Sequence, residues 1–118
     1  MKAVIYMRFG SADQISDVGD RINALTDLCN SKGMEINKVI TVVGSGTDAD
    51  RDGYKEAIRL AKEGEVDAIV VEKLEKLSRD YNELYPVLEE LHEKGVMVCG
   101  PDFDYSMHRQ EKPINLSR

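Results

Sequence analysis

Basic residues follow three separate apolar stretches of this chain, and each comes soon after its stretch ends. They are Arg8, Arg51 and, in one short segment, Lys73, Lys76 and Arg79. Arginine suits a phosphate ligand because its planar fork makes bidentate, charge-assisted hydrogen bonds to phosphate oxygens. Ser11 and Gln14 add a hydroxyl and an amide close behind the first arginine. These residue types indicate binding, or chemistry, at a phosphate group.

The elements that must position these residues alternate between strand and helix patterns. Apolar, β-branched runs predict strands at 3–7, 36–43, 66–71 and 96–99. Apolar residues at steps of three and four predict helices over 13–32, from Tyr54 to near Gly64, and from near Asn82 to Gly95. Such alternation requires crossover connections, so the predicted fold is α/β, a parallel four- to five-stranded sheet flanked by helices. In such sheets ligands bind beyond the carboxyl ends of the strands, where the basic residues lie.

Three local features refine this prediction. Gly33 is expected to end the first helix as its C-cap. The ten small or polar residues at 44–53 predict a loop, so that the second helix begins only at Tyr54. Pro86 would break a helical hydrogen bond, so the third helix either begins late, near Asn82, or is kinked.

Length and composition exclude several classes of protein. The 118 residues suit one domain, expected over 1–104, with a loose tail at 105–118. The net charge of −6 gives no general sign of nucleic-acid binding, and no apolar run reaches the ~20 residues of a membrane helix. Cys29 and Cys99 lie far apart without metal-ligand spacing, so a reduced, cytoplasmic protein without a metal or cofactor is expected.

Three blocks of the sequence resemble the serine recombinases of the resolvase and invertase type. The run Tyr6-Met7-Arg8-Phe9-Gly10-Ser11-Ala12-Asp13-Gln14 is similar to the family's Tyr-x-Arg-x-Ser-Thr-x-x-Gln pattern at the end of its first strand. Ser45-Gly46 and Arg51 are similar to a Ser-Gly pair and an arginine of the second loop. The segment 73–79 resembles the Lys-Leu-Asp-Arg-Leu-Ser-Arg motif after the third strand. The blocks keep the family's order and spacing, so the resemblance implies a resolvase-like catalytic domain.

The resemblance implies a metal-free phosphoryl transfer. In that family a serine hydroxyl attacks a DNA phosphodiester and forms a phosphoserine link, while clustered arginines stabilise the charge on phosphorus. Carried over by position, the site consists of catalytic residues Arg8, Arg51, Glu75, Lys76 and Arg79, and of phosphate-binding residues Arg8, Gln14, Arg51, Lys73 and Arg79.

The chain departs from the family pattern at the nucleophile itself. The family's serine falls at Gly10, which has no hydroxyl, and Ser11 stands one residue further along, where the family has threonine. Because a misplacement of ~1 Å can cost about a hundredfold in rate, Ser11 would be a poor substitute. Glu75 replaces an aspartate and Lys76 an arginine, which keeps both charges and loses the bidentate fork. We therefore expect an impaired active site.

Simpler interpretations exist for each motif. Ser11-Ala12-Asp13-Gln14 is also a capping box, in which the serine and glutamine side chains satisfy backbone amides at a helix start. Arg51 beside several aspartates could be a paired surface arginine. The charged run 72–77 could be a solvated helix face.

A different class of function is suggested by 44–49, Gly-Ser-Gly-Thr-Asp-Ala, which fits the dinucleotide fingerprint G-x-G-x-x-G/A, with Glu72 in the place of a ribose-binding acid. The fingerprint requires a helix to open at the glycines. The predicted loop through Gly53 argues against that interpretation.

The leading expectation is a serine recombinase catalytic domain that binds DNA, weakly on its own because no helix-turn-helix is present. The tail adds only a few basic residues, namely His108, Arg109, Lys112 and Arg118. A homodimer, or a hetero-oligomer with another recombinase, is the expected assembly. The alternative is a non-catalytic regulatory module that pairs with an active recombinase.

Overall fold

The computed structural model describes residues 1–9, 18–43 and 48–105, and of residues 48–51 only the backbone. Its elements are β1 (Lys2–Phe9), α1 (Val18–Ser31), β2 (Glu35–Val43), α2 (Asp48–Lys62), β3 (Ala68–Val70), α3 (Leu74–Leu77), α4 (Tyr81–Glu93), β4 (Met97–Gly100) and β5 (Phe103–Asp104). The five strands form one sheet in the order β2-β1-β3-β4-β5. Pairing is parallel except between β4 and β5. The predicted fold class is confirmed.

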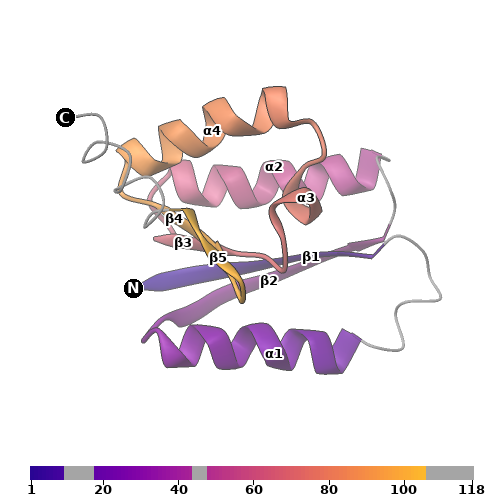
Figure 1. Ribbon diagram of the computed structural model, residues 1–118, viewed down its shortest axis with the longest axis vertical. Coiled ribbons are helices and arrows are strands. Elements are labelled where there is room, and N and C mark those ends of the chain that lie inside the picture. The colour runs from indigo at the N-terminus through magenta and orange to yellow at the C-terminus, as the bar shows by residue number, and fades with distance from the viewer. Residues whose placement is uncertain (10–17, 44–47, 106–118) are drawn as a thin grey trace.

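Helices cover both faces of this sheet. Figure 1 shows α1 alone on one face, with α2, α3 and α4 on the other. The face under α1 is lined by Ala3, Ile5, Met7 and Phe9 of β1, and the opposite face by Val4 and Tyr6. Every residue of β1 after Lys2 is buried, as expected for a central strand with helices on both sides. This strand carries the first candidate arginine to the carboxyl edge of the sheet.

The start of α2 corrects the sequence prediction. The helix begins at Asp48, not at Tyr54, so Gly53 lies inside it rather than in a loop. A Cβ atom on Gly53 would stand 2.5 Å from Cγ1 of Val42 and 3.3 Å from Cε1 of Tyr6. The glycine is therefore a close-packing contact between α2 and the sheet. A glycine that breaks a helix and one that lets a helix approach a strand look the same in sequence.

The segment between β3 and β4 holds two helices. The single turn α3 comes first, and α4 begins at Tyr81, where the Asp80 side chain accepts a hydrogen bond from the Glu83 amide (3.3 Å). Of the two predicted alternatives, the start of α4 fits a late beginning near Asn82, and Pro86 lies within the helix. Leu84, Leu88 and Leu91 bury its inner face. The chain after β3 thus forms two helices, α3 and α4, before it returns to the sheet as β4.

The first helix ends as predicted, and the cysteines lie in the core. Gly33 has φ +72°, the left-handed conformation of a helix C-cap. Cys29 in α1 and Cys99 in β4 are buried free thiols within one apolar cluster. Burial raises the pKa of both thiols, that of Cys99 to about 11. Both cysteines therefore stay protonated and unreactive in the folded protein.

Candidate functional site

Arg8 lies at the carboxyl end of β1 and is tied to α3. It is the one buried charged residue in the described part of the chain, with 4% of its surface exposed. Its Nη2 donates to the carbonyl oxygen of Glu75 (2.6 Å) and its Nε to that of Lys76 (3.2 Å). A guanidinium donating to the last carbonyls of a helical turn stabilises that turn. Arg8 therefore holds α3 against the sheet edge.

The other cations of this segment lie on and beside the turn that Arg8 holds. Lys73 is the extended N-cap residue of α3, and Lys76 lies on the turn itself. Lys73 and Arg79 are exposed, Lys76 is half-buried, and Leu77 anchors the turn in the core. The structure thus brings Arg8 to the backbone of Glu75 and Lys76, and presents the flanking cations to solvent.

A third arginine stands at the same edge and was missed in the sequence. Arg21 of α1 donates Nε to Oε2 of Glu72 (2.9 Å) and Nη2 to Oε1, and its guanidinium carbon lies 4.3 Å from the ring centroid of Phe9. Glu72 is the second residue after the end of β3. The sequence does contain one sign of its role, because Arg21 stands three residues after Val18, on the apolar stripe of its helix. A charge on a buried stripe requires an opposite charge on the surface that it packs against.

Several predicted site residues lie outside the described residues. Gly10, Ser11 and Gln14 fall within 10–17, and Ser45-Gly46 falls within 44–47. The basic residues of the tail fall within 106–118. Arg51 lies in the first turns of α2, without a described side chain. The choice between capping box and nucleophile for Ser11, and the convergence of Arg51 with Arg8 and Arg79, stay predictions.

The polar loop predicted through Gly53, which spoke against a dinucleotide site, is wrong, because α2 begins at Asp48, directly after 44–47. The order of the strands still speaks against such a site. The glycines follow β2, which is the edge strand, whereas a dinucleotide loop follows a strand beside the switch point of the sheet, here between β1 and β3.

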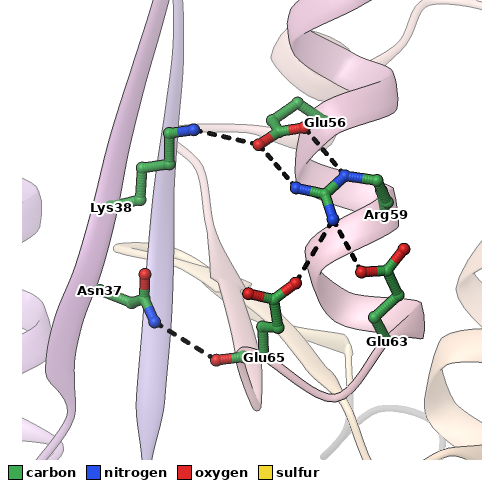
Figure 2. Close-up of polar contacts among 6 residues, drawn as sticks. All are labelled: Asn37, Lys38, Glu56, Arg59, Glu63 and Glu65. Carbon is green, nitrogen blue, oxygen red and sulfur yellow. Dashed lines mark hydrogen bonds and ion pairs between the residues drawn. The ribbon is translucent and has the colours of Figure 1, made fainter.

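A second group of charged residues links α2 to β2 and to the chain after α2. Figure 2 shows the Arg59 fork on Glu56 (2.9 and 3.0 Å), with further bonds to Glu63 (2.7 Å) and Glu65 (3.3 Å). Lys38 of β2 also reaches Glu56 (3.0 Å). Hydrogen bonds from these cations lower the pKa of Glu56 to about 2, and those with Glu56 raise the pKa of Arg59. Each charge in this network, which we call the Arg59 network, is met by an opposite one.

The described residues hold neither a cluster of metal ligands nor a membrane-spanning helix. Across 1–9, 18–43 and 48–105, no group of three acidic, histidine or cysteine side chains is placed to hold a metal ion. Within the same ranges no helix is long and apolar enough to cross a membrane.

Known proteins resemble this chain over most of its length. Residues 3–113 match the family model described as the N-terminal domain of resolvase. The chain is 33% identical over 98 residues to the transposon Tn3 resolvase of Escherichia coli, covering 83% of this chain and 49% of the relative. It is 33% identical over 95 residues to the DNA-invertase hin of Salmonella typhimurium, covering 80% of this chain and 45% of the relative.

A solved structure agrees with the fold. A resolvase family site-specific recombinase from Streptococcus pneumoniae superposes with a TM-score of 0.73 at 18% identity, covering 99% of this chain and 92% of that one. The chain spans about half the length of the curated relatives it matches. The match over 3–113 and the sheet described above lead to one conclusion: the chain belongs to the resolvase N-terminal domain family, the catalytic domains of the serine recombinases.

Proposed function

We propose that this chain is a serine recombinase catalytic domain that engages DNA phosphate at the carboxyl edge of its sheet and is impaired in strand cleavage. The observation that carries the proposal is the arrangement around α3, where buried Arg8 fixes the turn that bears Lys76, and Lys73 and Arg79 flank it in solvent. A turn with a fixed backbone keeps its cations close together, which lowers the cost of bringing them to one anion.

The impairment follows from the residue at the nucleophile position. In an active family member a serine oxygen attacks phosphorus, the new P–O bond forms as the bond to one DNA strand breaks, and that strand leaves with a hydroxyl. Gly10 stands where that serine is expected and supplies no oxygen. Lys76 in place of an arginine delivers charge without a bidentate fork. Phosphate binding is thus retained while covalent attack is lost.

The test is a covalent adduct assay. The native chain, Ser11→Ala and Gly10→Ser are each fused to the same DNA-binding domain, incubated with supercoiled DNA carrying its site, and run on denaturing gels beside an active relative. The native fusion is expected to give no protein-DNA adduct. An adduct from the native fusion that disappears in Ser11→Ala would identify Ser11 as a displaced nucleophile and contradict the impairment.

A regulatory module is the second candidate, favoured by the same glycine. A catalytic domain that retains its fold and lacks its hydroxyl can still pair with an active recombinase and change its output. Co-incubation distinguishes the two. A change in the adduct yield of the active relative upon adding this chain supports the module, and an unchanged yield at saturating chain concentration excludes it.

A further inference from the structure

The end of β1 carries two arginine contacts, one on each face of the sheet. Arg8 points to the face of α2 and α3, where it donates to the carbonyls of Glu75 and Lys76. On the α1 face, Phe9 supports the guanidinium of Arg21, which binds Glu72 through both carboxylate oxygens. Both contacts reach the same stretch of chain after β3. That stretch is held from two sides.

The Arg21–Glu72 pair has the geometry of a well-defined tether. Two parallel hydrogen bonds fix the relative orientation of guanidinium and carboxylate, which a single bond leaves open. The face of the guanidinium stacks on a ring that is itself 1% exposed. The two charged side chains are 23% and 24% exposed, so solvent screens the pair only in part. The pair joins residues 51 apart in the sequence.

The turn that this tether adjoins has little stability of its own. The helix α3 comprises four residues, and its N-cap, Lys73, makes no side-chain capping hydrogen bond. A single helical turn is not stable alone, since nucleation fixes several backbone angles for one hydrogen bond. Its direction therefore depends on what holds it at each end. Arg8 and Leu77 hold the later part, and Glu72, directly before the N-cap, holds the beginning.

We propose that Arg21 is a positioning residue, which acts through Glu72 to fix the direction in which Lys73 and Lys76 face the bound phosphate. This inference rests on the proposed phosphate site. The Glu72 carboxylate already neutralises Arg21, so the pair adds geometry and no net charge to the edge. If Arg21 were a direct phosphate ligand, removing the Glu72 carboxylate would free the positive charge of Arg21 and strengthen phosphate binding.

The two roles predict opposite effects of Glu72→Gln on phosphate affinity. The variants Arg21→Gln and Glu72→Gln are compared with wild type by NMR titration with inorganic phosphate. If Arg21 positions the turn, both variants weaken phosphate binding by about fivefold, the effect of losing one good ion pair. The charge swap Arg21→Glu/Glu72→Arg recovers part of that loss. Stronger binding in Glu72→Gln, or unchanged binding in both single variants, overturns the proposal.

A matched control excludes a general loss of stability. Arg59→Gln also removes a bidentate arginine pair, in the Arg59 network, and is expected to leave phosphate binding unchanged. If Arg21→Gln fails to fold, Arg21→Lys is measured instead, since it keeps the charge and loses the fork. Weaker phosphate binding in Arg21→Lys supports positioning, and wild-type binding overturns it.

Amide hydrogen exchange tests the role of Arg21 independently of phosphate binding. If the wild-type chain binds no phosphate, the proposed function fails, and exchange at 73–78 decides the role of Arg21. Faster exchange there in Arg21→Gln and Glu72→Gln, and not in Arg59→Gln, supports positioning. Unchanged exchange overturns it.

Discussion

Arginine is used in opposite ways in two regions of this protein, the Arg59 network and the end of β1. Arg59 is 45% exposed and meets three carboxylates on the outside of α2. Arg8 is 4% exposed and meets two main-chain carbonyls at the end of β1. The exposed region has more ion pairs, but solvent weakens each of them. The number of charge contacts is therefore a poor guide to which arginine the fold depends on.

Arg8→Met should have the largest effect. Methionine keeps most of the apolar stem and leaves the partly buried carbonyls of Glu75 and Lys76 without their donor. A hydrogen bond from a charged donor contributes about 1.5 to 3 kcal/mol, and partial exposure weakens these two bonds, so the loss in unfolding free energy should be about 2 to 4 kcal/mol. Urea denaturation measures it. A loss below that of Arg59→Met would reverse the comparison between the two regions.

Gly53→Ala tests whether packing, rather than charge, holds α2 to the sheet. The new methyl group would meet Cγ1 of Val42 at 2.5 Å, and overpacking of this kind costs about 1 to 3 kcal/mol. Gly19→Ala in α1 is the matched control, because its Cβ meets nothing within 4 Å, and it should stabilise the protein by up to about 1 kcal/mol. Thermal denaturation should move in opposite directions for the two variants. Equal shifts would contradict the packing argument.

Arg59→Gln should lower the free energy of unfolding only slightly, although it removes contacts to Glu56, Glu63 and Glu65, because solvent weakens exposed ion pairs. The difference from wild type should shrink further in about 1 M salt, which screens exposed charges. Denaturation midpoints at low and high salt check this. A large, salt-independent loss would show that the Arg59 network is a structural centre of the fold.

The smallest effect should come from the pH dependence of Glu56. Its pKa falls from 4.5 in the unfolded chain to about 2 in the fold. A lowered acid pKa stabilises the fold above pH 4.5, and that contribution disappears as the pH falls from 4.5 to about 2. The stability difference between wild type and Glu56→Gln should therefore narrow across this interval. A constant difference would mean that Glu56 is not held by its cations.

The sequence alone predicted the fold and the basic residues at the carboxyl edge of the sheet, but not every contact that holds them. Val4 and Ile5 in a continuous apolar run indicate a strand covered on both faces, and that pattern requires no knowledge of partners. Gly53 was misassigned because its conformation depends on Val42, a neighbour across the packing interface. Arg21 was missed for the same reason, since its partner Glu72 is distant in sequence. Hydrophobic periodicity indicates which face of a helix or strand is buried, but not which residues pack against that face.

We expect an anion to bind at the edge around Arg8 and α3, and not at the Arg59 network. The decisive measurement is an amide chemical-shift titration of the whole chain with inorganic phosphate. Saturable shifts are expected at 73–79, with Lys38 and the 56–65 segment unaffected. Shifts centred on Lys38 and 56–65, with 73–79 unchanged, would contradict it.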